Sequence, residues 1–184
     1  MNYKLLLIPY LIVAICFLAV SIVIERRNHP DHSYAQGIVK ILLLFLVGGV
    51  IYIGIELGFR GYSHWSMFLL GGYCFIQLGL INEIVSWETP LELQAFIGAI
   101  LVTINEFIVG CIVNLGYGLN VWDYSNLPCN IMGQICIPFT IIWFFIAIIG
   151  IVVDDLLRYC LWKEEVPRYY IASTKQEIRL DVKI

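Results

Sequence analysis

Residues 105–143 read NEFIVGCIVNLGYGLNVWDYSNLPCNIMGQICIPFTIIW, and the rest of the chain is organised around this stretch. It consists of an apolar segment that carries Glu106 and Asn114, a polar loop over residues 117–130, and a second apolar segment that carries Gln134 and Trp143. A carboxylic acid within a membrane helix costs about 2.5–3.5 kcal/mol on insertion scales, so it needs a partner or a function. We therefore expect the polar site of a membrane protein in this stretch.

The composition is that of an integral membrane protein. Of the 184 residues, 60% are hydrophobic and 14% are charged, so a soluble domain of this size would expose too much apolar surface. A net charge of −3 provides no positive field for nucleic acid. The sequence also lacks the Gly-x-x-x-x-Gly-Lys-Ser/Thr loop that cradles phosphates in many ATPases. We therefore expect membrane lipids as surroundings, no nucleic-acid partner and no nucleotide hydrolysis by that route.

Long apolar runs predict an all-α helical bundle with about five membrane-spanning helices, because about 20 apolar residues cross the hydrocarbon core. We divide the chain into an N-terminal transmembrane helix (1–27), a four-helix core with an outer WDYS loop (38–153) and a cytoplasmic tail (154–184). The tail is short and polar, and we expect it to be partly disordered. The predicted spans are residues 5–24, 38–58, 67–85, 91–115 and 135–153.

Small residues predict which helix faces pack together. In the second span, glycines at four positions would allow a close helix contact. In the fourth span, small and polar residues recur in steps of three and four, and the fifth span carries a similar stripe, so these two helices should pack against each other. The glycines are Gly48, Gly49, Gly54 and Gly58; the stripes are Ala95, Ala99, Thr103, Glu106, Gly110 and Asn114, and Cys136, Thr140, Trp143, Ala147 and Gly150.

The placement of Lys and Arg predicts the orientation, because cytoplasmic loops carry the excess of positive charge. The first loop and its edges carry Arg26, Arg27 and Lys40, and the tail carries further Lys and Arg residues, whereas the other side has Lys4 and Arg60. The Ile-rich composition points to a bacterium, and we expect a multi-pass protein of its plasma membrane. Its N-terminus would lie outside, its C-terminus in the cytoplasm, and the WDYS loop on the outer face.

On this topology, polar residues from several segments converge at one level of the membrane. Glu106 could relay a proton. Alternatively, Glu106 and Asp123 could bind a cationic group of a substrate or lipid, or the cluster could be a structural network that pins the loop to the bundle. The candidate substrate-binding residues are Glu56, Arg60, His64, Glu106, Asn114, Trp122, Asp123, Tyr124, Asn130 and Gln134.

The sequence predicts no metal site and no cofactor. The turn His29-Pro-Asp-His32 offers three candidate ligands without a fourth, and we interpret it as a solvated loop. None of the six cysteines forms a Cys-x-x-Cys pair, and those within apolar runs are expected to act as small packing residues. A bridge between Cys129 and Cys136 is geometrically conceivable.

A longer pattern resembles a known family. The chain carries Asn105-Glu-Phe-x-x-Gly110, Trp122-Asp-Tyr-Ser-x-x-Pro-x-Asn130 and Gly133-Gln-Ile-Cys136. With these motifs it resembles, over residues 41–153, the family of small bacterial membrane proteins labelled putative ABC transporter type IV, or CmpB-like. The resemblance implies a permease-like role in transport. Because the chain carries no ATPase domain, it also implies an ATPase subunit in trans or assembly into a homo-oligomer.

We therefore expect a transport-associated membrane protein whose buried functional carboxylate is Glu106, with an unknown substrate. One alternative is a membrane-embedded enzyme that acts on a lipid or cell-wall precursor through Glu106, His64 and Asp123. No nucleophile with a neighbouring base supports that chemistry, so we assign no catalytic residue. A second alternative is a sensor or accessory membrane subunit, in which the tail would carry the function.

Overall fold

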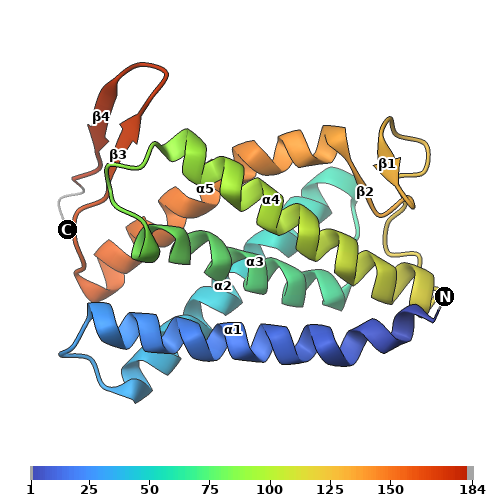
Figure 1. The fold of residues 1–184 in the computed structure, drawn as a ribbon, viewed down its shortest axis with the longest axis horizontal. Helices are drawn as coiled ribbons and strands as arrows, with labels where there is room; N and C mark the ends of the chain where they lie inside the picture. Colours follow the sequence, from blue (N-terminus) through green and yellow to red (C-terminus); the bar gives the residue numbers. More distant parts are fainter. Residues whose placement is uncertain (1, 182–184) are drawn as a thin grey trace.

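The structure, a computed structural model, describes residues 2–181 and confirms an all-α bundle (Figure 1). Within the described residues, five helices are long and apolar enough to cross a membrane. A short 3-10 turn leads into the first helix, and the fourth ends in a π-helical turn. The elements are η1 (Tyr3–Leu6) with α1 (Leu7–Asn28), α2 (Tyr34–Arg60), α3 (Trp65–Ile84), α4 (Leu91–Gly110) with η2 (Cys111–Gly116), and α5 (Ile137–Trp162).

Two small antiparallel hairpins lie at opposite ends of the bundle (Figure 1). Strand β1 (Asn130–Ile131) pairs with β2 (Ile135–Cys136) within the loop between α4 and α5. Strand β3 (Arg168–Ile171) pairs with β4 (Gln176–Arg179) after α5. We call the first end the loop end and the second the tail end; the turn between α1 and α2 also lies at the tail end (Figure 1).

Local sequence signals set the helix boundaries. Ser33 and Gln36 form a capping box at the start of α2, which satisfies amide groups that the first turn leaves free. Gly61, with φ of 76°, ends that helix in the left-handed region that glycine adopts without strain. The His64 side chain accepts from the Ser66 amide and caps α3. A proline in the first turn of α5 suits a position whose amide needs no helical partner.

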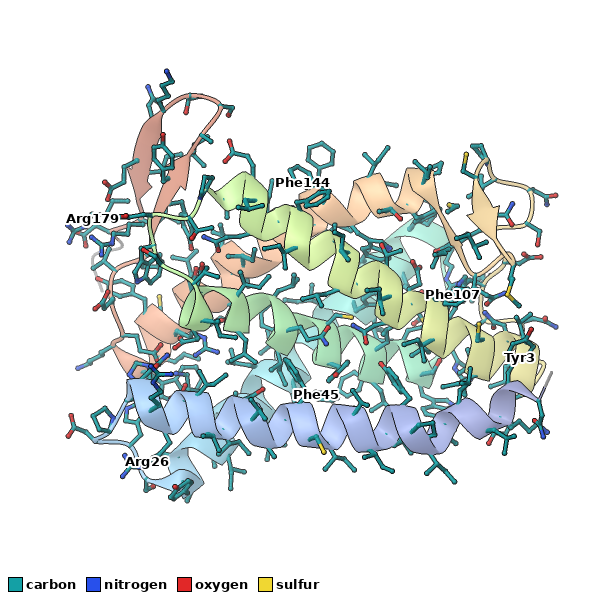
Figure 2. The ribbon with its side chains drawn as sticks, viewed as in Figure 1. Tyr3, Arg26, Phe45, Phe107, Phe144 and Arg179 are labelled. Carbon is teal, nitrogen blue, oxygen red and sulfur yellow. The ribbon has the colours of Figure 1, made fainter. Side chains whose placement is uncertain are left out.

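Helix α3 forms the centre of the bundle and α1 its edge. Over the 18 most apolar consecutive residues of each span, 72% of the residues in α3 are buried, compared with 6% in the span that contains α1. Figure 2 shows the labelled Phe45 and Phe144 along the length of the bundle, whereas Arg26 and Arg179 lie at the tail end. This distribution, apolar along the length and charged at an end, suits a protein that spans a bilayer.

Glycines allow α2 and α3 to approach closely. A Cβ atom on Gly48 would lie 2.2 Å from the Phe75 Cβ, and one on Gly71 would lie 2.3 Å from the Tyr52 Cβ. The expected glycine contact is therefore present at Gly48 and Gly49. It is absent at Gly54 and Gly58, where an added Cβ meets nothing within 4 Å, because those positions face away from the neighbouring helices.

The expected packing of the fourth span on the fifth is present. The Thr103 hydroxyl lies 3.3 Å from the Thr140 hydroxyl. Ala99 and Ala147 are 3% and 1% exposed, and Ile104, on the opposite face of α4, is 50% exposed. The small and polar stripe of α4 therefore faces protein, and Ile97, Ile100 and Ile104 face outward, whereas Ile112 at the end of the span is 3% exposed.

Helix α5 continues to Trp162, past the expected end at residue 153. Asp154 and Arg158 are therefore helical and buried, with a 2.5 Å ion pair between them. A prediction from hydropathy alone places the end of a span at such charged residues. Charged side chains that neutralise each other can nevertheless remain within the bundle. Within the described part of the chain all six cysteines are free, so Cys129 and Cys136 form no bridge.

Candidate functional site

Glu106 lies near the end of α4 and is 1% exposed. One carboxylate oxygen accepts a 2.9 Å hydrogen bond from the Tyr124 hydroxyl, and the other accepts a 2.9 Å hydrogen bond from the Trp143 indole. Tyr124 comes from the loop and Trp143 from α5. Three separate segments therefore meet at this carboxylate, and both of its oxygens have a partner.

Aromatic rings enclose this carboxylate. The Trp143 ring stacks on Tyr52 of α2 at a centroid distance of 5.8 Å, and the Tyr124 ring stacks on Phe139 at 4.4 Å. Burial, followed by the charge of Glu106, raises the pKa of Tyr124 well above its usual value. Tyr124 therefore keeps its proton at neutral pH and remains a hydrogen-bond donor to Glu106.

A cavity of about 140 Å³ lies next to this cluster, between α2 and α5 beneath the loop. Its rim includes Ile55, Phe59 and Ile142, which are 42%, 76% and 42% exposed on the side of the bundle. The cavity therefore lies against the lipid-facing side of the protein. Its polar and aromatic lining includes Tyr52, Glu56, Arg60, Trp122, Tyr124, Phe139 and Trp143.

An ion pair closes the loop end of this cavity. Arg60 Nη2 lies 2.5 Å from Glu56 Oε1, and Arg60 Nη1 donates to the Val121 carbonyl at 2.6 Å. The Ser63 hydroxyl donates to the other oxygen of Glu56. Arg60 Nε is buried without a hydrogen-bond partner among the described residues. The pair therefore ties α2 to the loop and leaves one buried donor at the cavity wall.

Asn114 anchors the start of the loop to the bundle. It lies in η2, the π-helical turn that ends the fourth span, and such turns are frequent at functional sites. Its amide donates to the Trp122 carbonyl and to Gln134 Oε1 at 3.1 and 2.8 Å, and its oxygen accepts from the Val121 amide at 2.7 Å. The Trp122 indole in turn donates to the Gln134 carbonyl at 2.9 Å. These bonds hold the loop over the Glu106 cluster.

Asp123 and Asn130 stabilise the loop itself. Asp123 accepts from the Ser125 amide and hydroxyl at 2.8 and 2.5 Å, and these bonds hold the pKa of Asp123 below its usual value. Asn130 donates to the Leu127 carbonyl at 2.9 Å and accepts from the Gly133 amide at 3.1 Å. Their described bonds therefore lie within the loop, and Glu106 is not among their partners.

The structure thus separates the predicted residues into groups. Glu56, Arg60, Trp122 and Tyr124 line the cavity beside Glu106, whereas Asn114 and Gln134 form the loop anchor. The polar contacts of His64 are with Ser66, at 2.8 Å between Nδ1 and Oγ, so it serves as a helix cap. A functional role for these residues stays a prediction.

Several aromatic residues that line the cavity were missing from the predicted set, namely Tyr52, Phe59, Phe139 and Trp143. Trp143 lies on the small-residue stripe of the fifth span, and its position opposite Glu106 was a usable signal. The sequence gives no such signal for Tyr52. This residue lies within an apolar run, and its contact with Trp143 joins residues that are far apart in the sequence.

Two further polar groups lie away from this cavity. In the middle of the bundle, the Asn105 amide donates to Gln77 at 2.6 Å and the Tyr10 hydroxyl donates to Asn105 at 3.2 Å, which links α1, α3 and α4. At the tail end, Lys40 and Arg158 lie among several carboxylates. Neither group was among the predicted site residues.

Comparison with known proteins gave one result. The model of the family described as "putative ABC-transporter type IV" matches residues 2–164. The match therefore extends beyond residues 41–153 to include α1 and all of α5. Comparisons with curated proteins and with solved structures gave no match.

Proposed function

Because the chain belongs to the family described as "putative ABC-transporter type IV", we propose that it is a permease-like membrane subunit whose substrate site is the cavity beside Glu106. The family and the five membrane-spanning helices make the chain a transport-associated membrane protein. The proposal rests on the Glu106 carboxylate. This group is 1% exposed, accepts hydrogen bonds from Tyr124 and Trp143, and lies next to a cavity.

The surroundings of the cavity favour a small substrate with an apolar body and a cationic group. Tyr52, Trp122, Tyr124 and Trp143 surround it with aromatic rings, and ring faces attract cations such as ammonium groups. Glu106 supplies a buried carboxyl group behind Tyr124 and Trp143. Exposed apolar residues at the rim suit a substrate that enters from the bilayer.

An ATPase would have to be supplied by another chain, because this sequence lacks the phosphate-binding loop of many ATPases. We place the tail end in the cytoplasm, where such a partner would dock, and the loop end outside. The distribution of Lys and Arg supports this orientation.

The enzyme alternative receives less support. It required Glu106, His64 and Asp123 to act together, but the described hydrogen bonds of His64 are with Ser66 and those of Asp123 are with Ser125. A general acid and base must both reach the reacting group. We therefore keep transport as the proposed function.

Gentle purification from the native membrane, followed by mass spectrometry, tests the proposed partner. We expect an ATPase to co-purify with the chain in amounts comparable to the chain itself. A preparation that contains lipid but no ATPase after chemical cross-linking in the membrane would contradict the permease-subunit proposal.

A further inference from the structure

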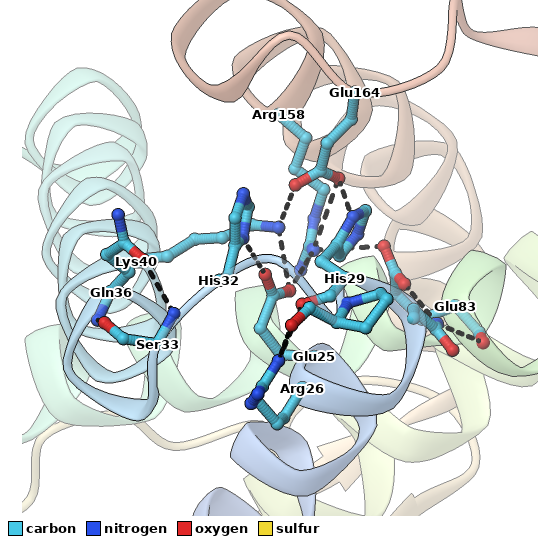
Figure 3. Close-up of polar contacts among 12 residues, drawn as sticks. Glu25, Arg26, His29, His32, Ser33, Gln36, Lys40, Glu83, Arg158 and Glu164 are labelled. Atoms are coloured by element: carbon cyan, nitrogen blue, oxygen red, sulfur yellow. Dashed lines mark hydrogen bonds and ion pairs between the residues drawn. The ribbon is translucent and has the colours of Figure 1, made fainter.

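Charged side chains from four helices and from the segment after α5 meet at the tail end of the bundle, opposite the loop end (Figure 1). Figure 3 shows their contacts. Glu25 is in the last turns of α1, Lys40 is in α2, and Glu83 is at the end of α3. Arg158 is in α5, and Glu164 follows that helix. Glu25, Lys40 and Arg158 are 2%, 0% and 2% exposed, so this cluster belongs to the interior.

Two carboxylates of the cluster each use one oxygen to bind the same ammonium group. Lys40 Nζ lies 2.7 Å from Glu25 Oε2 and also contacts Glu164 Oε1. The second oxygen of each carboxylate faces a histidine from the turn between α1 and α2. Lys40 therefore holds Glu25 and Glu164 side by side, with their other oxygens toward the imidazole rings.

The distances from these oxygens to the histidines are long for hydrogen bonds. His29 Nε2 lies 3.5 Å from Glu164 Oε2, and His32 Nδ1 lies 3.3 Å from Glu25 Oε1. Neighbouring ligand atoms around a tetrahedral metal ion with bonds of about 2.1 Å lie roughly 3.4 Å apart. Ligand atoms of Glu25, His29 and Glu164 all lie within 4.8 Å of one another. Small shifts of these side chains would therefore bring their ligand atoms to the spacing of a metal site.

The formal charges of the cluster do not balance. Arg158 lies 2.5 Å from Asp154 and 3.0 Å from Glu83, and it also lies 3.4 Å from Glu25 and 3.9 Å from Glu164. Glu25, Glu83, Asp154 and Glu164 oppose Lys40 and Arg158, which leaves an excess of two negative charges when the histidines are neutral. Buried charge without compensation is costly. One divalent cation would neutralise the excess.

The cluster is also open to a ligand. The side chains of His29 and His32 are 25% and 26% exposed. A cavity of about 320 Å³ is lined by His29, Glu164 and Arg158.

We propose that Glu25, His29 and Glu164 bind one divalent transition-metal ion, with His32 placed to serve as a fourth ligand. Mixed imidazole and carboxylate ligands suit Zn²⁺ or Mn²⁺, whereas Mg²⁺ and Ca²⁺ prefer oxygen ligands alone. Asp31, the third candidate ligand in the His-Pro-Asp-His turn, is exposed and is not part of the cluster. The missing ligands come from α1 and from the segment after α5, which sequence spacing alone does not reveal.

Metal binding to the purified full-length chain tests this site. The chain is purified without a polyhistidine tag, treated with a chelator, and titrated with Zn²⁺, Mn²⁺ and Mg²⁺ by calorimetry. Co²⁺ serves as a spectroscopic probe of nitrogen and oxygen ligands. The variants are His29→Asn and Glu164→Gln, and the control is Asp31→Asn from the same turn. Thermal unfolding without metal shows whether each variant is folded.

We expect wild type and Asp31→Asn to bind about one Zn²⁺ or Mn²⁺ per chain. His29→Asn and Glu164→Gln should each weaken binding by about ten-fold or more, because each removes a ligand. Folded His29→Asn or Glu164→Gln protein that binds metal as tightly as wild type would overturn the site. So would wild-type protein that binds no transition metal. Neither result depends on transport or on Glu106.

Discussion

Replacement of Glu106 should separate its structural role from its proposed role in substrate binding. In Glu106→Gln, the amide oxygen can accept from the Trp143 indole, and the amide nitrogen can donate to the Tyr124 hydroxyl, which also accepts hydrogen bonds. Both contacts of the wild-type carboxylate are then kept without its charge. In Glu106→Ala, neither donor retains its partner.

The expected magnitudes follow from these contacts. A hydrogen bond to a charged group contributes about 1.5–3 kcal/mol and a neutral one about 0.5–1.5 kcal/mol, so Glu106→Gln should lower the free energy of unfolding by about 2 kcal/mol. A buried donor left unsatisfied costs about 1–3 kcal/mol. Glu106→Ala leaves two such donors, Tyr124 and Trp143, so its cost should be about 2–6 kcal/mol, plus that of the lost volume.

Thermal unfolding in detergent, followed by size-exclusion chromatography, gives the order of stability. We expect wild type to be the most stable, Glu106→Gln to be less stable by about 2 kcal/mol, and Glu106→Ala to be the least stable. Tyr124→Phe, which removes one of the two bonds, should lie between Gln and Ala. If Glu106→Ala unfolds at the wild-type temperature, the two hydrogen bonds do not hold the loop, and the reasoning is refuted.

Asn114→Ala removes the bonds that hold the start of the loop, so it should lower stability by about 1–3 kcal/mol and speed proteolysis in the loop; an unchanged cleavage rate would contradict this. Gly71→Ala places a Cβ 2.3 Å from the Tyr52 Cβ and should cost about 1–3 kcal/mol. Gly54→Ala meets nothing within 4 Å and should change the unfolding temperature little; equal effects would refute the packing argument. In a background without native cysteines, a cysteine at Ser125 should react with an impermeant reagent on intact cells, and one at Thr174 only after permeabilisation. The reverse pattern would invert the orientation.

The sequence predicts much of the fold because apolar runs and small-residue stripes are local signals. The stripe on the fourth span correctly indicated that Glu106 faces protein. The end of α5 was missed because hydropathy treats Asp154 and Arg158 as exterior residues, although they neutralise each other in the interior. The contact of Tyr52 with Trp143 and that of His29 with Glu164 join distant segments, so neither leaves a periodic signal in the sequence.

The division of the tail from the core shows the same limit. Composition marks the residues after 153 as polar, and the described part of this segment contains both the end of α5 and the β3–β4 hairpin. Tyr169 of the hairpin donates to Asp155 of α5 at 2.7 Å. A contact of this kind depends on folding, so polarity alone cannot distinguish a packed hairpin from a free tail.

Ligand-dependent stabilisation of the purified chain in lipid nanodiscs tests the central claim, a cation site at Glu106, most directly. The panel contains choline and benzylamine with their neutral counterparts, dimethylbutanol and benzyl alcohol. The proteins are wild type, Glu106→Gln and, as a control, Asp123→Asn, whose carboxylate bonds to Ser125 in the loop. We expect a cation to stabilise wild type and Asp123→Asn but not Glu106→Gln, with little effect of the neutral compounds. Equal stabilisation of wild type and Glu106→Gln, or none of wild type by any cation, would contradict it.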